Sequence, residues 1–394
     1  MRMLLVAGAR PNFVKIAPLL RAVAAYHDIE ATLVHSGQHY DERMSEAFFR
    51  DLEIPPPDLN LNVGSASHAV QTAEVMKRFE PVLLAYAPDV VVVAGDVNST
   101  LACALTAAKL GVPVAHVEAG LRSFDRTMPE EINRVLTDHV SDFLFTTEPS
   151  AQRNLRREGV ARDKIFAVGN VMADSLLGFL DKASRSDILS RLQLGDAEPY
   201  ALVTLHRPAS VDEAASLHRL LAAINAMSRL IRVIFPVHPR TSQQMEKHGV
   251  AVEAGVRLVE PLGYLDFLRL MTKARLVLTD SGGVQEETTV LRVPCLTLRQ
   301  NTERPITLSL GTNRLVGSDA RRILRQVRAI LAGHERRGRI PRLWDGRAGE
   351  RIIAILHREL SAAAGRRKNS ALETTVRETE IAMPSPAAGA VASR

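Results

Sequence analysis

The sequence predicts an α/β protein made of two similar units, each with a parallel β-sheet covered by helices. Two observations predict this fold class. Short apolar runs rich in β-branched residues alternate with helix-length amphipathic stretches along most of the chain, a pattern typical of βαβ units. The pattern also turns polar over residues 181–200 and then begins again, which indicates a join between the two units near residues 170–198.

The first unit is expected to hold five strands separated by helices. Its run Val90–Val93 consists of valine alone, which fits a central strand buried on both faces. The expected strands are Leu4–Ala7, Ala31–His35, Val90–Ala94, Val114–Val117 and Phe143–Thr146, and the expected helices include Lys15–Tyr26, Thr72–Ala85 and Leu101–Leu110.

The second unit repeats this alternation. The expected strands are Tyr200–Leu205, Val233–Pro236, Val256–Val259, Leu276–Thr279 and Cys295–Leu298, and the expected helices include Ala214–Ser228 and Tyr264–Ala274. A closing helix is expected over Ala348–Leu360. The last stretch, Gly365–Arg394, begins with basic residues and continues rich in Pro, Ala, Ser and Gly, which predicts a disordered tail.

Composition narrows the class of partner. The chain has 394 residues, 50 Lys and Arg against 44 Asp and Glu, a net charge of +6 and 4% aromatic residues. This modest excess without a basic stripe favours a small anionic ligand over nucleic acid. The two cysteines lack a CxxC or His-spaced partner and no apolar run is long enough to span a membrane. We therefore expect a cytoplasmic protein with reduced, buried cysteines.

Polar residues follow many of the expected strands. In open parallel sheets ligands bind beyond the carboxyl ends of the strands, so these residues are expected to outline one cleft between the two sheets. They are Gly8-Ala9-Arg10, Ser36-Gly37-Gln38-His39, Gly95-Asp96, Glu118-Ala119-Gly120, His206-Arg207, His238 and Asp280-Ser281-Gly282-Gly283.

The segment Ser281-Gly282-Gly283 joins a strand to a helix. Glycines permit close backbone approach and a helix N-terminus offers free N–H groups, so this turn is a candidate phosphate site. Glu287, about one helical turn later, is a candidate acceptor for ribose hydroxyls. The alternative is a tight turn that precedes an acidic first turn. The sequence has no GxxxxGK[ST] and no GxGxxG after the first strand, so neither a P-loop nor the common NAD fingerprint is supported.

Three basic residues are candidate donors to such an anion. Arg10 and Lys15 flank the start of a helix at Pro11, and Arg304 lies in Thr-Glu-Arg-Pro. Facing a diphosphate, Arg10 and Arg304 would form charge-assisted hydrogen bonds. The alternative for each is an ordinary surface charge.

Three carboxylates and two histidines are candidates for proton transfer. Asp96 alternatively caps the next helix, and Glu130 alternatively complements a helix dipole. Glu118 ends a buried strand and therefore needs a partner. His206 and His238 close strands of the second unit. Candidate partners of Glu118 are Arg122, Arg126 and Arg134, and the histidines and acids are too dispersed for a zinc signature.

Several motifs resemble those of the non-hydrolysing UDP-N-acetylglucosamine 2-epimerases. They are GARPNFVKIAPL, SGQHYD, GDVNSTLA, VEAGLRSFDRTMPEEINR, VTLHRP, PVHPR and LTDSGGVQEE…TERP, in this order over residues 8–305. The resemblance implies a GT-B-type fold and a homodimer. It implies Rossmann-like domains over residues 1–175 and 176–347, with a C-terminal helix, 348–364, that packs back on the first and a tail over 365–394.

The resemblance also implies a reaction and a site. The family interconverts UDP-GlcNAc and UDP-ManNAc without NAD or metal, by eliminating UDP and adding it back to a 2-acetamidoglucal. Acid–base roles fall on Asp96, Glu118 and Glu130, and the catalytic histidine is His206. Substrate contacts fall on Arg10, Lys15, His238, Phe267, Ser281, Gly282, Gly283, Glu287 and Arg304, with Phe267 on the uracil side.

Some positions depart from the family pattern and leave alternatives open. The first motif reads GARPNFVK where many members have GTRPEAIK, and Tyr40-Asp41 follows Gln38-His39, unlike members with a second, regulatory substrate site. Alternatives are an epimerase for a modified UDP-sugar, such as UDP-2,3-diacetamido-glucuronate, or a hydrolysing enzyme that releases ManNAc. A GT-B glycosyltransferase would not need three acids around the sugar. A non-catalytic UDP-sugar-binding regulator would not need them either.

Overall fold

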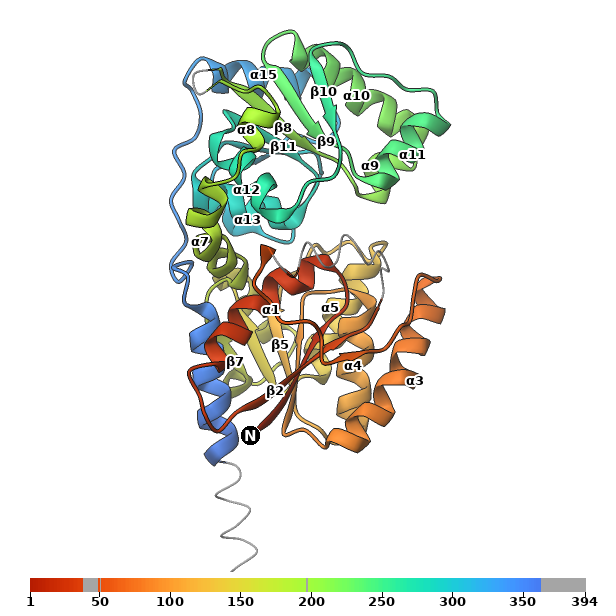
Figure 1. Cartoon of the computed structure of the whole chain (residues 1–394), viewed down its shortest axis with the longest axis vertical. Helices are drawn as coiled ribbons and strands as arrows, with labels where there is room; N and C mark the ends of the chain where they lie inside the picture. Colours follow the sequence, from red (N-terminus) through yellow and green to blue (C-terminus); the bar gives the residue numbers. More distant parts are fainter. Residues whose placement is uncertain (38–48, 50, 196–197, 363–394) are drawn as a thin grey trace, which may run out of the picture.

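The computed structural model describes residues 1–37, 49, 51–195 and 198–362, apart from the side chain of Arg10. Within these residues the chain forms two α/β domains, which lie one above the other in Figure 1. The expected tail, Gly365–Arg394, and the predicted residues Gln38-His39 and Tyr40-Asp41 lie outside the described residues.

The N-terminal domain is built on a parallel sheet of seven described strands in the order β3-β2-β1-β4-β5-β6-β7. The strands are β1 (Arg2–Ala7), β2 (Glu30–His35), β3 (Leu59–Asn60), β4 (Val90–Ala94), β5 (Val114–Ala119), β6 (Phe143–Thr146) and β7 (Ile165–Ala167). The helices are α1 (Arg10–Val23), α3 (His68–Tyr86), α4 (Asn98–Lys109), α5 (Pro129–Val140) and α6 (Pro149–Arg157), with a 3₁₀ turn at Arg162–Lys164.

The C-terminal domain has a parallel sheet of six described strands in the order β10-β9-β8-β11-β12-β13. The strands are β8 (Tyr200–Thr204), β9 (Arg232–Pro236), β10 (Val256–Val259), β11 (Leu276–Thr279), β12 (Cys295–Thr297) and β13 (Asn313–Leu315). The helices are α9 (Pro208–Val211), α10 (Ala214–Ser228), α11 (Pro239–Lys247), α12 (Tyr264–Lys273), α13 (Gly282–Leu291), α14 (Pro305–Ser309) and α15 (Ala320–Leu331).

The ten predicted strands are all confirmed, each with ends within two residues of the prediction. The strands that the sequence did not predict, β3, β7 and β13, have two or three residues each and lie at sheet edges. Such short, half-exposed strands carry no periodic pattern. The two cysteines, Cys103 and Cys295, are buried and free, as predicted.

One helix contacts both domains, and a second helix, later in the chain, packs beside the N-terminal domain. Helix α7 (Val171–Ser184) is followed by the short α8 (Ile188–Arg191) and packs against α1 of the N-terminal domain and against α12 and α13 of the C-terminal domain. Residues 348–362 form a helix that runs beside the N-terminal domain (Figure 1). The Gly349 amide N–H donates to the Asp174 carboxylate at 2.7 Å, and His357 pairs with Asp28 at 2.7 Å.

Each sheet has one topological switch point, where the strand order reverses direction. In the N-terminal sheet β1 lies between β2 and β4, and in the C-terminal sheet β8 lies between β9 and β11. Loops that leave β1 and β4, or β8 and β11, diverge to opposite faces of their sheet, which leaves room for a ligand. Asp96 follows β4 and His206 follows β8, so candidate residues lie at both switch points.

Candidate active site

Glu118 lies at a bulge in β5, and this bulge sets the direction of its side chain. The pairing of β5 with β6 shifts register between Val117 and Ala119, and Glu118 has a φ of 74°. A bulge re-aims the side chain it contains, and a positive φ outside glycine is rare and marks a functional constraint. Both Glu118 and its ion-pair partner Lys15, from α1, are buried.

Gly95 makes room for that lysine. A Cβ atom added at Gly95 would lie 2.6 Å from the Lys15 Nζ, and Gly95 also has a φ of 71°. The loop after β4 therefore needs glycine for both space and backbone conformation. Lys15 and Glu118, far apart in sequence, meet above this glycine.

Asp96 pairs with Arg134 of α5 and has a side chain 26% exposed. Burial acts to raise the pKa of Asp96, but the positive charges of Arg134, Lys15 and Arg304 outweigh it and lower the pKa to about 2. The alternative role of Asp96 as a helix cap is wrong, because α4 begins after Val97 without a side-chain cap. Asp96 is therefore a charged carboxylate that faces the cationic groups of the site.

Two adjacent glutamates at the start of α5 differ in their surroundings. Glu131 is buried, accepts hydrogen bonds from Ser123 and the Phe124 amide at 2.9 Å, and pairs with Arg134 at 2.6 Å. Glu130 is half-buried and makes no hydrogen bond or ion pair with another described residue. Glu131 thus holds the loop in place, and Glu130 is the carboxylate left for a ligand.

On the opposite side, His206 follows β8 and rests on a buried acid. Asp280, at the end of β11, is fully buried, and its Oδ1 lies 3.1 Å from the His206 Nδ1. Asp280 also accepts the amide N–H groups of His206 and Arg207 at 3.1 and 2.9 Å. Burial raises the pKa of Asp280, but these donors outweigh it and the net shift is downward. The ionised carboxylate therefore orients one ring nitrogen of His206 and leaves the other for a ligand.

His238 caps α11 and lies beside His206, with ring centroids 5.9 Å apart. Its Nδ1 accepts the Arg240 amide N–H at 3.2 Å. The turn Ser281-Gly282-Gly283 opens α13 as predicted, with Ser281 as N-cap. The helix N-terminus accordingly lies at the same end of the C-terminal sheet as the two histidines.

Arg304 connects the two sides of the site. Its Nη2 donates to the Glu118 Oε1 at 2.5 Å, across 186 residues of sequence. Its Nε lies 3.0 Å from the Glu286 Oε1, and its Nη1 donates to Glu303 at 2.5 Å. A Cβ at Gly282 would lie 2.5 Å from the Arg304 Nη1. Arg304 thus contacts Glu118 of the N-terminal domain and the first turn of α13 together.

Glu303 forms ion pairs with several arginines. Its carboxylate pairs with Arg299 at 2.8 Å and with Arg207 at 3.4 Å, besides Arg304. Burial acts to raise the pKa of Glu303, but the three arginines hold it well below its usual range. Glu303 is therefore an ionised anchor that fixes three cations at one place.

Two neighbouring acids of α13 behave in the opposite way. Glu286 and Glu287 are almost fully buried, and burial raises the pKa of each to about 7. Asn170 donates to Glu286 at 2.9 Å, and the Tyr264 hydroxyl donates to Glu287 at 3.0 Å. Both acids consequently change charge near neutral pH, unlike Asp96 and Glu303.

The structure thus brings together most of the predicted site. Lys15, Glu118 and Arg304 are in direct contact, and Gly282 packs against Arg304. Phe267 lies half-buried on α12, and the side chain of Arg10 lies outside the described residues. The expected partners of Glu118 were wrong. Arg122 pairs with Asp138 and Glu158, and Arg134 pairs with Asp96 and Glu131. Arg126 is exposed and makes no ion pair with another described residue.

Sequence reasoning missed the residues that organise the site. They are Glu286, Glu303 and Arg299, together with the roles of Asp280, Arg207 and Arg134, which the sequence analysis named without these contacts. All are polar neighbours of residues that were predicted, so the available signal was their position in the same strand-end segments. Among the described residues, no group of three or more His, Cys, Asp and Glu side chains is arranged to hold a metal ion.

The arrangement combines two chemical capacities. Lys15, Arg304 and the N-terminus of α13 offer positive charge and N–H donors to an anionic leaving group. Carboxylates at Asp96, Glu118 and Glu130 and the imidazole of His206 supply groups for proton transfer. No helix in the described part of the chain has the length and apolar character needed to cross a bilayer.

Comparison with known proteins gives consistent matches. A family model described as UDP-N-acetylglucosamine 2-epimerase matches residues 21–357. The protein of that name from Methanocaldococcus jannaschii is 43% identical over 366 residues, 90% of this chain and 99% of the relative. A Pseudomonas aeruginosa UDP-2,3-diacetamido-2,3-dideoxy-D-glucuronate 2-epimerase is 42% identical over 334 residues, 84% of this chain and 92% of the relative.

A solved structure resembles the whole fold. The crystal structure of the M. jannaschii UDP-GlcNAc 2-epimerase in complex with UDP-GlcNAc and UDP superposes with a TM-score of 0.85 at 43% identity. The match covers 91% of this chain and 99% of that one.

Proposed function

The chain belongs to the UDP-N-acetylglucosamine 2-epimerase family, and on that premise we propose that it interconverts UDP-GlcNAc and UDP-ManNAc without hydrolysing either. The observation that carries the proposal is the contact between Glu118 and Arg304. It holds a carboxylate suited to proton transfer against a cation and a helix N-terminus suited to a diphosphate. A reaction that removes a proton while a diphosphate departs needs this adjacency.

Diphosphate binding also explains how the carboxylate becomes available. Both oxygens of Glu118 are engaged, one by Lys15 and one by Arg304. A diphosphate at the N-terminus of α13 would take over these two cations, since phosphate oxygens are strong acceptors for guanidinium and ammonium groups. Glu118 would then be released from both cations and could contact the sugar.

The proposed chemistry proceeds in two halves. A base removes the proton from C2 of the hexosamine while the C1–O bond breaks and UDP leaves with the bonding electron pair, which gives 2-acetamidoglucal. UDP then adds back at C1 as an acid returns a proton to the opposite face of C2. Inversion needs proton-transfer groups on both faces, and we assign Asp96, Glu118, Glu130 and His206 to this set.

The proposed substrate contacts are those that the family resemblance implies. We propose that Arg10, Lys15, Arg304 and the turn Ser281–Gly283 bind the diphosphate, and that Glu287, Phe267 and His238 contact the rest of the nucleotide sugar. The raised pKa of Glu287 leaves it able to accept or donate a hydrogen bond near neutral pH.

Isotope exchange tests the proposal. Incubation with UDP-GlcNAc in D₂O should place deuterium at C2 of both UDP-sugars, with the products recovered as UDP-sugars. In the Glu118→Gln variant, exchange should fall by about 10³-fold or more, with UDP affinity within about threefold of wild type. Release of free ManNAc and UDP would show a hydrolysing enzyme. Tight UDP binding without exchange by the wild type would show a non-catalytic binder, and exchange by the variant at wild-type rate would remove Glu118 from the mechanism.

A second candidate substrate has a specific basis. The P. aeruginosa 2-epimerase for UDP-2,3-diacetamido-2,3-dideoxy-D-glucuronate is almost as similar to this chain as the M. jannaschii relative is, at 42% against 43% identity. Comparing kcat/KM for the two UDP-sugars decides between them. A ratio above about 100 for either assigns the substrate, because it corresponds to a difference of about 3 kcal/mol in transition-state binding.

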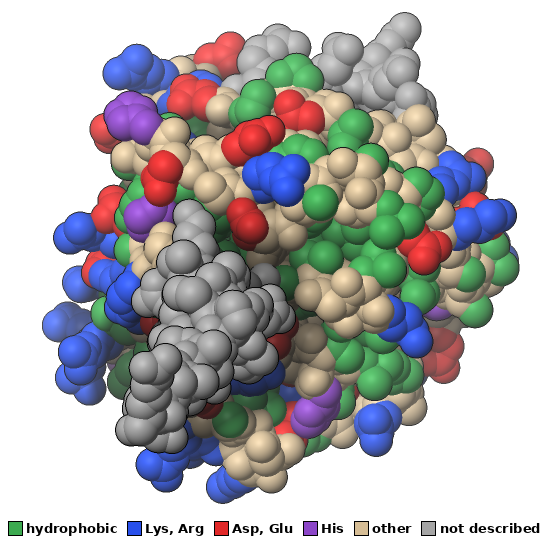
Figure 2. Space-filling view, turned by 90° about the horizontal axis from the view of Figure 1, so that it is seen from below, with side chains coloured by type: hydrophobic (Ala, Val, Ile, Leu, Met, Phe, Trp, Pro, Cys, Tyr) green, Lys and Arg blue, Asp and Glu red, His purple; other side chains and the backbone are tan. Residues whose placement is uncertain are grey.

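We also propose a homodimer that works in the cytoplasm. Figure 2 shows hydrophobic side chains gathered on one half of the face seen from below. Exposed apolar residues of the N-terminal domain include Leu84, 67% exposed at the end of α3, and Leu110, 37% exposed after α4. Light scattering of the purified chain should give twice the monomer mass, and a monomer at micromolar concentration would contradict the proposal.

A further inference from the structure

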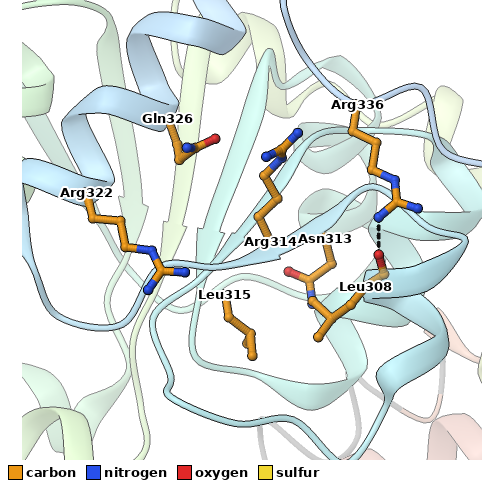
Figure 3. A pocket seen from close by; sticks show the side chains of 7 residues that line it. All are labelled: Leu308, Asn313, Arg314, Leu315, Arg322, Gln326 and Arg336. Atoms are coloured by element: carbon orange, nitrogen blue, oxygen red, sulfur yellow. Dashed lines mark hydrogen bonds between the residues drawn. The ribbon is translucent and has the colours of Figure 1, made fainter.

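A surface recess beside β13, the edge strand of the C-terminal sheet, is lined by arginines. It has a volume of about 510 Å³ and lies between the edge strand β13, the end of α14, helix α15 and the segment that follows α15. Its lining residues are Leu308, Asn313, Arg314, Leu315, Arg322, Gln326 and Arg336 (Figure 3). Figure 1 shows α15 at the end of this domain that points away from the N-terminal domain.

The three guanidinium groups come from three separate segments. Arg314 extends from β13, Arg322 from α15 and Arg336 from the following segment, and all three surround the recess in Figure 3. Arg336 is held in place because it donates to the carbonyl oxygens of Leu308 and Ser309. Arg314 and Arg322 are exposed, and their side chains make no hydrogen bond or ion pair within the described part of the chain.

Nearby acids do not neutralise this charge. Of the described residues, no Asp or Glu lines the recess. Glu335 is adjacent to Arg336 in sequence, but both its oxygens accept from Arg275 at 3.0 Å. Asp319 caps α15 by accepting the Arg322 amide N–H at 3.0 Å. Three uncompensated positive charges around one recess repel one another, and a bound anion would relieve this repulsion.

We propose that this recess binds an oligophosphate anion. Guanidinium groups pair with phosphate oxygens in a bidentate manner, and three of them match the charge of two or three linked phosphates, each about −1 to −2. The volume suits a small ligand. The lining holds no aromatic side chain to stack on a base, so the phosphate part is what the recess recognises. None of the lining residues is a proposed contact of the UDP-sugar.

Calorimetric titration of the full chain with sodium tripolyphosphate tests the proposal. UDP is left out, because its diphosphate would compete for the recess, and the arginine variants distinguish the recess from the other anion site. At about 0.15 M salt, the wild type should bind one tripolyphosphate at the recess, and UTP should bind there within about threefold of the same affinity because the base is not read. The double variant Arg314→Ala/Arg322→Ala should bind tripolyphosphate at least about tenfold more weakly.

A charge-matched control separates a site from a basic surface. Arg321→Ala/Arg325→Ala removes two exposed arginines of the same helix that do not line the recess, and should change the affinity by less than about threefold. Equal weakening in both double variants, or no binding by the wild type up to about 1 mM, would overturn the proposal. Heat of binding is the readout, so the result stands whether or not the chain proves to be an epimerase.

Discussion

Asp280 illustrates how one buried side chain determines the state of an exposed one. It is fully buried, whereas the His206 side chain it pairs with is 41% exposed. A carboxylate on Nδ1 fixes the tautomer and the ring orientation, so that Nε2 is the ring nitrogen that could contact a ligand. In the proposed mechanism Asp280 is therefore a positioning residue and His206 is the group that acts on the substrate.

Replacing Asp280 by Asn should lower kcat by about 10²-fold, because the ring loses its ionised partner. KM should change by less than about threefold, since the amide oxygen still accepts the backbone N–H groups. The pH profile of kcat should also shift. In a His206→Asn background the second change should cost nothing further. If Asp280→Asn lowers kcat equally in the wild-type and His206→Asn backgrounds, or changes KM alone, the role of Asp280 is structural only.

The buried carboxyl group of Glu287 should make the free energy of unfolding depend on pH. Its pKa is raised to about 7 by burial, above the ordinary value of 4.5. Between these values the folded state holds a proton that the unfolded state has released, so the free energy of unfolding falls as pH rises through this window. The loss attributable to one such group is on the order of 3 kcal/mol.

The Glu287→Gln variant should therefore lose less stability than the wild type between pH 4.5 and 8. Urea unfolding at both pH values measures the difference. Glu335→Gln serves as control, because the pairing of Glu335 with Arg275 lowers its pKa and its effect lies below this window. A pH dependence identical in wild type and Glu287→Gln would contradict the assignment.

At the scale of single residues, the sequence predicted the ends of strands better than the contacts made there. Asp96, Glu118 and His206 were found because each directly follows a strong strand pattern. The partners of Glu118 were missed because Arg304 reaches it across 186 residues. No local pattern encodes a contact that depends on how two domains meet.

Helix α13 depends on a small residue at its first position. A Cβ at Gly282 would lie 2.5 Å from the Arg304 Nη1 and 2.9 Å from the Glu303 Oε1. Alanine is a better helix former than glycine by up to about 1 kcal/mol. Any harm from Gly282→Ala must consequently come from displacement of the Arg304 guanidinium.

Gly282→Ala should weaken UDP binding by about tenfold or more, because Arg304 can no longer lie against the helix N-terminus. Calorimetric titration with UDP measures this loss. Gly195→Ala is the matched control, since a Cβ there meets nothing within 4 Å. If Gly282→Ala binds UDP with unchanged affinity, Arg304 does not contribute to the anion site.

Long, buried strands were predicted from the sequence, whereas short, partly exposed strands were not. Strands with four or more apolar residues in a row were located to within two residues at each end, and β4 was predicted with both ends correct. The edge strand β13 was missed because it has three residues, only one of them buried. This omission matters for function, since β13 contributes Arg314 to the arginine recess.

At the scale of the whole molecule, the predicted fold class and family are both confirmed. The chain crosses between the domains through α7 and returns before residues 348–362. Trp344, the single tryptophan, lies at this return, 1% exposed, and its Nε1 donates to the Thr147 carbonyl oxygen at 3.0 Å. Its fluorescence therefore reports on the attachment of the C-terminal segment to the N-terminal domain.

The final helix should be needed for the stability of the first domain. Ile352, Ile353 and Leu356 are fully buried in the core that includes strands β1 and β4. Leu356→Ala leaves a cavity there and should lower the free energy of unfolding by about 2–5 kcal/mol, measured by urea denaturation followed through Trp344. Arg358 is exposed and, among the described residues, pairs with its neighbour Glu359 alone, so Arg358→Ala should change the free energy of unfolding by less than about 0.5 kcal/mol. If both variants unfold at the wild-type midpoint, the helix contributes nothing to the first domain, and the two ends of the chain fold independently.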